Sequence, residues 1–103
     1  LRLVHPYNVI IHPDAVLGER VTLYHNVTIA TLLSGPRKGT PVIGDDVTIY
    51  PSAVVMGDIH VGDGATIGAG SVVIHSVPAG GVVAGNPARL VSSAEGARNE
   101  DEE

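Results

Sequence analysis

The 103-residue sequence contains no cysteine, no tryptophan and no phenylalanine, and its only large aromatic residues are Tyr7, Tyr24 and Tyr50. Without cysteine, the chain has no disulfide framework, no thiolate metal site and no cysteine nucleophile. A core built with so few aromatic rings must consist of valine, isoleucine, leucine and alanine. The length corresponds to a single domain.

Charge is also sparse, and it is unevenly distributed. Charged residues make up 17% of the chain and the formal net charge is −5. Five of the acidic residues lie in residues 92–103, so residues 1–91 are nearly neutral. A neutral body with few aromatic rings differs from a nucleic-acid-binding surface. No apolar run approaches the roughly 20 residues of a membrane span. We therefore expect a cytoplasmic protein that binds neither nucleic acid nor membranes.

The sequence does contain a repeat of six residues. Aliphatic residues recur at this spacing in two runs: Ile11, Leu17, Leu23 and Ile29, then Ile43, Ile49, Val55, Val61, Ile67 and Val73. Four positions after each comes a second inward candidate, which is mostly small or β-branched: Ala15, Val21, Val27, Leu33, Val47, Ala53, Ile59, Ala65, Ser71 and Val77. A period of six fits neither an α-helix nor an alternating strand, but it suits a short strand followed by a sharp corner.

Three such hexads close one triangular coil, and successive coils stack at the strand spacing of about 4.8 Å. Glycine, aspartate, asparagine and proline between the aliphatic positions supply the geometry of the corners. A small β-sandwich, the ordinary alternative, predicts strand and turn spacings of roughly 8 to 12 residues. We therefore predict an all-β fold, a single-stranded parallel β-helix with a little over three triangular coils.

The repeat is interrupted once and fades near the C-terminus. The step from Ile29 to Ile43 is 14 residues long, which predicts that residues 35–42 form a loop extruded from the coil. The β-helix domain is expected to span residues 1–91, with an end cap at residues 79–91. Residues 92–103 are predicted to form a disordered acidic tail. Loops that interrupt a solenoid commonly lie on its binding face.

The hexads, with residues 67–73 (IGAGSVV) and the closing residues 83–89 (VAGNPAR), resemble the left-handed β-helix acyltransferases of the hexapeptide-repeat superfamily. The resemblance covers nearly all of residues 5–91. It is greatest to serine acetyltransferase and the related sugar and polysaccharide O-acetyltransferases, which carry an active-site loop in a 14-residue step. It implies a left-handed coil, a homotrimer, and acetyl-CoA or another acyl-CoA as co-substrate in the groove between neighbouring coils.

Acyl transfer from a thioester to a hydroxyl needs a general base, and histidine suits that role near neutral pH. Counting hexads backwards places His5 where serine acetyltransferases carry a catalytic histidine, so the resemblance implies His5 as the base. His25, one coil further on the same face, is the second candidate. His12 suits a corner for its turn geometry, whereas His60 and His75 are expected to face solvent.

Two residues depart from the serine acetyltransferase pattern. Val4 replaces the aspartate that precedes the catalytic histidine, and Thr40 replaces a histidine before the loop proline, Pro41. The second departure favours the sugar O-acetyltransferase branch. The expected acceptor is therefore a hydroxyl of a small molecule such as a sugar or serine.

The expected CoA site combines basic and small residues. Arg37 and Lys38 of the loop and Arg89 of the end cap are candidates for binding the CoA phosphates, although they also suit a solubilising role. The resemblance implies that the pantetheine arm lies along corners kept open by small residues, namely Ala30, Ser52, Ala69 and Gly70.

Two other functions compete with acyl transfer. A non-catalytic binding or scaffold protein would retain the coils and the trimer but not the CoA groove. A metalloprotein similar to γ-carbonic anhydrase would need three converging histidine ligands. The histidine spacing of this chain matches that need poorly, and we predict no metal site.

Overall fold

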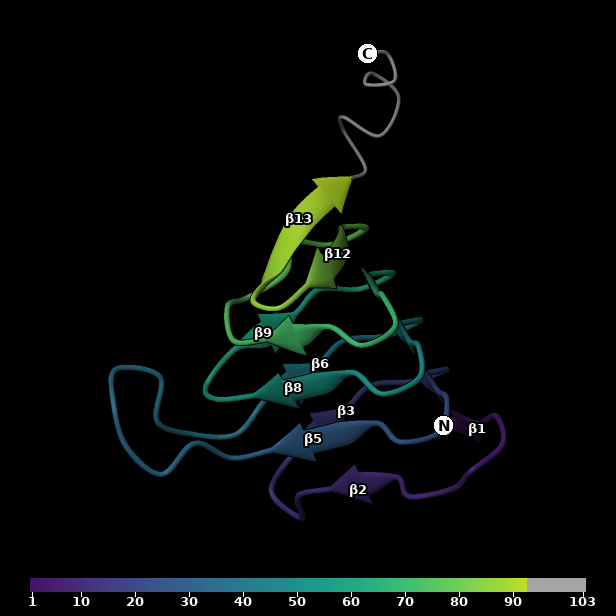
Figure 1. The fold of residues 1–103 in the computed structure, drawn as a ribbon, viewed down its shortest axis with the longest axis horizontal. Helices are drawn as coiled ribbons and strands as arrows, with labels where there is room; N and C mark the ends of the chain where they lie inside the picture. Colours follow the sequence, from purple (N-terminus) through teal and green to yellow (C-terminus); the bar gives the residue numbers. More distant parts are fainter. Residues whose placement is uncertain (93–103) are drawn as a thin grey trace.

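The computed structural model describes residues 1–92, which form a triangular coil of short strands (Figure 1). The strands are β1 (Arg2–Leu3), β2 (Ile10–Ile11), β3 (Val16–Leu17), β4 (Thr22–Leu23), β5 (Thr28–Ala30), β6 (Val42–Ile43), β7 (Thr48–Ile49), β8 (Val54–Met56), β9 (His60–Val61), β10 (Thr66–Ile67), β11 (Val72–Val73), β12 (Val82–Gly85) and β13 (Ala88–Ser92). Most have two or three residues because each hexad turns a corner after one short extended segment.

The strands assemble into three sheets, one on each side of the triangle. The first sheet has the order β1-β4-β7-β10-β12-β13, the second β11-β8-β5-β2 and the third β3-β6-β9. All pairs are parallel except β12 with β13, which are antiparallel. The predicted fold class, a left-handed parallel β-helix, is confirmed. The first sheet has five parallel strands and thus four turns of coil. This exceeds the prediction of a little over three because β1 and β12 lie outside the run of hexads.

The core is the column of aliphatic side chains inside the triangle. Eight of the ten first hexad positions are buried, and those of the lowest coil, Ile11 and Leu17, are half-buried because no coil lies beneath them. The second positions are buried as well, with two exceptions. Ala15 is half-buried, and Leu33 is 81% exposed, so the inward prediction for Leu33 is wrong. Leu33 belongs to the extruded loop and not to a hexad.

The corners of the coil are built from left-handed backbone. Asn26, Ser52 and Gly70 stack in one column with φ of 58°, 66° and 69°, and Asp46 and Gly64 do so in another with φ of 58° and 72°. Asparagine, aspartate and glycine tolerate this conformation best, which explains their recurrence between the hydrophobic positions.

The three corner columns are named for the feature that distinguishes each of them. The histidine corner joins the first sheet to the second (residues 4–9, 24–27, 50–53 and 68–71). The loop corner joins the second to the third (residues 12–15, 31–41, 57–59 and 74–76). The acidic corner joins the third to the first (residues 18–21, 44–47, 62–65 and 78–81).

The extruded loop projects from the loop corner (Figure 1). It extends over residues 31–41, between the end of β5 and the start of β6. The predicted range of 35–42 is therefore too short at its start, and its last residue, Val42, pairs with Val16 as part of β6. Leu32 and Gly39 form an antiparallel bridge across the base of the loop. The Thr31 hydroxyl donates to the Gly39 carbonyl oxygen at 2.9 Å, which ties the same two segments together.

The predicted end cap contains a hairpin of β12 and β13, joined through a cis peptide bond between Asn86 and Pro87. Ser92, predicted as the first residue of the tail, is instead the last residue of β13. The remainder of the predicted tail lies outside the described residues. Within residues 1–92 there is no helix with the length and apolar character needed to cross a membrane.

Candidate functional site

The two histidine candidates lie close together at the histidine corner. Leu3 pairs with Leu23, and the Val4 N–H donates to the Leu23 carbonyl oxygen at 2.8 Å, so His5 lies opposite His25 in the next coil. The ring centroids are 6.5 Å apart and the rings are edge to face, with an interplanar angle of 73°. The chain therefore brings both candidates together on one face, as the sequence predicted.

The hexad count that ranked His5 first is wrong. Leu3, not His5, pairs with the buried Leu23 and so occupies the strand position that opens the hexad. The count fails because Pro6 and Tyr7 add two residues to this corner, before Asn8 comes level with Asn26. The Asn8 amide donates to the Asn26 side-chain oxygen at 3.1 Å, which fixes this alignment.

The fold uses the polar groups of the histidine corner only in part. The Nδ1 atom of His25 is buried and has no hydrogen-bond partner within the described residues. None of the residues in this corner is aspartate, glutamate, lysine or arginine. A buried polar atom without a partner is costly to a fold, and such atoms are often found where a ligand or a reaction uses them.

Tyr24 and Tyr50 form a stacked pair beside the histidines. Their ring centroids are 4.8 Å apart with an interplanar angle of 22°. The hexad pattern predicted no role for either tyrosine. The signal that identifies them is that each tyrosine directly follows a buried first hexad residue, Leu23 or Ile49, in strands that pair with each other.

The structure divides the predicted CoA-binding residues between two corners and the end cap. Ser52, Ala69 and Gly70 lie at the histidine corner with the two histidines. Arg37 and Lys38 lie on the loop, and Ala30 is the last residue of β5, where the loop begins. Arg89 lies on β13, level with Ala84 of β12.

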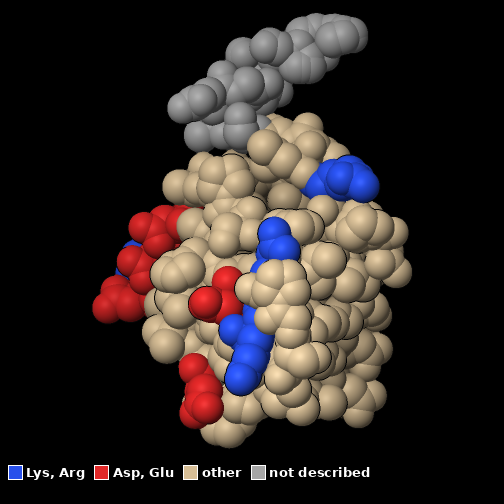
Figure 2. All heavy atoms as spheres, turned by 90° about the vertical axis from the view of Figure 1, so that its left-hand side faces the viewer, with Lys and Arg blue, Asp and Glu red and all other residues tan. Residues whose placement is uncertain are grey.

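Apart from Arg89, which lies in the first sheet, these groups lie on opposite edges of the second sheet. From Val27 to Thr31 the chain crosses one side of the triangle in four extended steps, a span of about 13 Å. In Figure 1 the loop and the corner between β1 and β2 lie at opposite sides of the molecule. Figure 2, which faces the loop side, shows basic side chains over the middle of this face. Residues 1–92 of one copy enclose no pocket. One chain by itself therefore does not assemble the predicted residues around one ligand.

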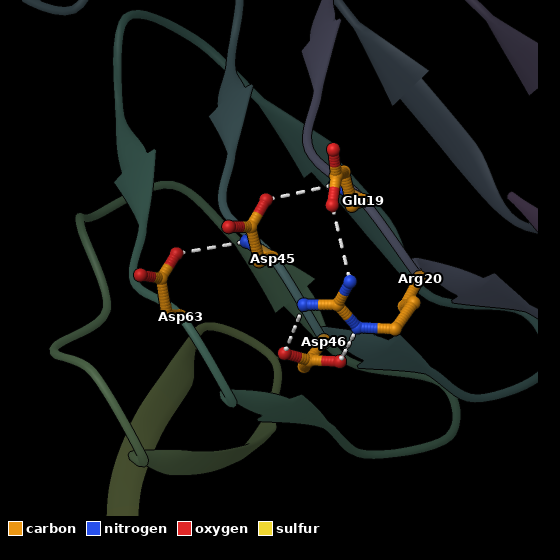
Figure 3. A network of polar contacts seen from close by, with 5 residues as sticks. All are labelled: Glu19, Arg20, Asp45, Asp46 and Asp63. Atoms are coloured by element: carbon orange, nitrogen blue, oxygen red, sulfur yellow. Dashed lines mark hydrogen bonds and ion pairs between the residues drawn. The ribbon is translucent and has the colours of Figure 1, made fainter.

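The acidic corner carries the main network of polar contacts between side chains (Figure 3). Arg20 donates to Asp46 through Nε at 2.6 Å and through Nη2 at 3.0 Å. A third bond joins Arg20 Nη1 to Glu19 Oε1 at 3.1 Å. The hydrogen bond from Arg20 lowers the pKa of the exposed Asp46 carboxyl, and the same contact raises the pKa of Arg20.

Two further carboxylates of this corner bind backbone N–H groups of the coil below. Asp45 accepts from the Glu19 N–H and Asp63 from the Asp45 N–H, each at 2.8 Å. Their positions explain Gly18 and Gly44, where a Cβ atom would collide with the Asp45 and Asp63 carboxylates respectively. The acidic corner is thus occupied with holding the coil together.

The other histidines lie at the loop corner or at the edge of the third sheet. His12 Nδ1 accepts a hydrogen bond from the Asp14 N–H at 3.0 Å, which confirms its predicted role in the turn. His60 and His75 are exposed, as expected. Among the described residues, no three histidine, aspartate or glutamate side chains gather in a way that would hold a metal ion.

Comparison with known families matches residues 40–75 to the model described as bacterial transferase hexapeptide, six repeats. Serine acetyltransferase 4 of Arabidopsis thaliana is 41% identical over 93 residues, which cover 86% of this chain and 25% of that protein. Serine acetyltransferase of Bacillus subtilis is 41% identical over 87 residues, covering 84% of this chain and 40% of the relative. The chain therefore spans only a quarter to two fifths of these curated relatives.

The solved structures that superpose on this chain are also serine acetyltransferases. Serine acetyltransferase from Neisseria gonorrhoeae superposes with a TM-score of 0.82 at 37% identity, covering 90% of this chain and 36% of that one. The enzyme from Brucella abortus, solved in complex with coenzyme A, has a TM-score of 0.83 at 35% identity and covers 89% of this chain and 37% of its own.

Proposed function

Because the chain belongs to the hexapeptide-repeat acyltransferase superfamily, we propose that it is the acyl-transferring β-helix of a CoA-dependent O-acetyltransferase. The observation that carries the proposal is the histidine corner, where two histidine rings lie edge to face and a buried imidazole nitrogen has no partner among the described residues. The structural relative solved with coenzyme A supports the choice of acetyl-CoA as donor. The acceptor is a hydroxyl of a small molecule, and a cytoplasmic location stays a prediction.

In this proposal the acceptor attacks acetyl-CoA directly. The chain has no cysteine and no evident seryl nucleophile to carry the acetyl group. A histidine of the pair accepts the proton of the acceptor hydroxyl. At the same time, the hydroxyl oxygen of the acceptor forms a bond to the thioester carbonyl carbon. The tetrahedral intermediate then collapses, the carbon–sulfur bond breaks, and the CoA sulfur leaves with the proton returned by the imidazolium.

We assign the base to His25, with His5 as its neighbour. The hexad count that ranked His5 first does not agree with the strand register. His25 lies in the second coil, between the first coil and the Tyr50-Pro51-Ser52 corner above it. A half-buried imidazole with a buried nitrogen is held more firmly than His5, which is exposed at the open end of the coil.

The division of the site between two corners supports a homotrimer. A cyclic arrangement places the loop corner of one copy against the histidine corner of the next, and three copies close the ring. Arg37 and Lys38 of one copy would then bind CoA phosphates while His25 of its neighbour meets the acetyl group. Outward-facing Ile10 and Val16, 60% and 54% exposed, supply apolar surface for such contacts. Light scattering should give a mass about three times 10.6 kDa, and a monomer at micromolar concentration would contradict the trimer.

Calorimetric titration with CoA tests the donor site. We expect binding by the wild type and about tenfold weaker binding by the double variant Arg37→Ala, Lys38→Ala, because charge-assisted hydrogen bonds to phosphate are lost. Arg2→Ala, which removes an arginine from β1, is the matched control and should bind CoA normally. A wild type that binds no CoA at millimolar concentration would exclude the acetyltransferase and leave a non-catalytic scaffold.

A further inference from the structure

We propose that the acceptor is an uncharged pyranose sugar that stacks on Tyr50 beside His25, an inference that rests on the function proposed above. The relatives named above are serine acetyltransferases, so the proposal separates this chain from them in substrate. It rests on three features of the histidine corner: its aromatic surface, its hydrogen-bonding groups and its lack of formal charge.

The aromatic surface is formed by the Tyr24 and Tyr50 stack. Tyr24 is half-buried and Tyr50 is 37% exposed, so the pair presents Tyr50 to solvent. The next residue in the column above Tyr50 is Gly68, since the Tyr50 N–H bonds to the Ile67 carbonyl oxygen. Gly68 has no side chain to cover the tyrosine ring. A flat, exposed ring face is the surface against which the C–H face of a pyranose packs.

The polar groups around this ring are amides and hydroxyls. Asn8 and Asn26 are joined by one hydrogen bond, which leaves the Asn26 amino group and the Asn8 oxygen with further capacity. Ser52 lies in the same corner column and is exposed. Such groups bind sugar hydroxyls as both donors and acceptors, whereas they do not neutralise an ionic ligand.

The absence of charge argues against an amino acid. Serine carries an ammonium and a carboxylate at neutral pH, and burying either without an opposite charge is unfavourable. The histidine corner contains no aspartate, glutamate, lysine or arginine. The loop that a neighbouring copy would bring (residues 31–41) carries Arg37 and Lys38 but no acidic residue. The carboxylates of the loop corner, Asp14 and Asp58, lie outside this loop.

The test compares two acceptors with the full chain and acetyl-CoA: methyl glucopyranoside as a neutral pyranose, and L-serine. CoA thiol release measures rate, and mass spectrometry of the acceptor confirms transfer. We expect kcat/KM for the pyranoside to exceed that for serine at least tenfold. Tyr50→Ala should raise the KM for the pyranoside about fivefold or more, whereas Tyr50→Phe, which keeps the ring, should restore the wild-type KM.

Each outcome decides the proposal. A preference for serine, or an unchanged KM in Tyr50→Ala, would overturn the sugar acceptor while leaving acetyl transfer intact. CoA binding without transfer to either acceptor would also overturn it. A wild type that binds no CoA would overturn the proposed function first, and this inference with it. The CoA titration thereby distinguishes failure of the acceptor from failure of the enzyme.

Discussion

The histidine corner and the acidic corner have the same backbone and opposite side-chain chemistry. In the first, the N–H groups of Asn26, Ser52 and Gly70 donate to carbonyl oxygens of the coil below at 2.8 to 3.0 Å. In the second, those of Asp46, Gly64 and Gly80 do the same at 2.8 Å. The same backbone hydrogen bonds between coils therefore hold both corners.

The side chains of the two corners are used differently. At the acidic corner, carboxylates accept backbone N–H groups and pair with Arg20, so the fold itself consumes them. At the histidine corner, the buried His25 nitrogen and the exposed face of Tyr50 have no such role. Groups that the scaffold leaves unused are therefore the ones available for a ligand.

The largest expected effect is a loss of catalytic activity when the histidine corner is changed. His25→Ala should lower acetyl transfer by about 10²- to 10⁴-fold, the usual contribution of a positioned general base. CoA affinity should change little because the phosphates bind elsewhere. His5→Ala should reduce turnover less, and His60→Ala, which changes an exposed histidine on β9 of the third sheet, serves as the control. If His5→Ala has the larger effect, the base is assigned to the wrong coil.

The second effect is a loss of folding stability when a glycine in either corner is replaced by alanine. A Cβ at Gly62, in the acidic corner, would collide with the backbone of Ala79 and Pro78, whereas a Cβ at Gly70 in the histidine corner meets nothing within 4 Å. Gly62→Ala should cost about 3 kcal/mol from overpacking. Gly70→Ala should cost roughly 1 to 2 kcal/mol, because of its left-handed backbone alone. Chemical denaturation measures both, and equal losses would contradict the difference in packing.

A smaller effect follows from removing side chains where the backbone is left-handed. Ser52→Gly relieves the conformational strain at the histidine corner and should stabilise the protein by about 0.5 kcal/mol after the entropy of glycine is counted. Asp46→Gly at the acidic corner gives the same relief but loses both bonds to Arg20. It should therefore show no gain in chemical denaturation. A gain in both variants would mean that the Arg20 contacts contribute nothing.

The smallest effect is a pH dependence confined to the acidic corner. Because the Arg20 hydrogen bond lowers the pKa of Asp46 in the folded state, this pair stabilises the fold above the ordinary aspartate pKa. The contribution is lost as pH falls through the lowered pKa. Thermal melts at pH 7 and pH 3 should bring wild type and Asp46→Asn closer together at the lower pH. The difference should be small because the pair is exposed and screened by solvent.

The spacing of aliphatic residues by itself determined the coil. Every hexad from Val21 onward buries the predicted side chains, apart from Leu33, because a constant period places the same positions inside the triangle at each turn. The interruption after Ile29 likewise located the loop. These features depend on local periodicity, which a single sequence displays fully.

Only the tertiary structure decided which corner each functional side chain occupies. A count of six cannot detect the two extra residues at Pro6 and Tyr7, so it misplaced His5, and only strand pairing aligned His5 with His25. The same holds for the stack of Tyr24 and Tyr50 and for the separation of Arg37 and Lys38 from the histidines. The physical reason is that contacts between coils depend on insertions and register, and these are fixed when the coils stack and not by the sequence of any one hexad.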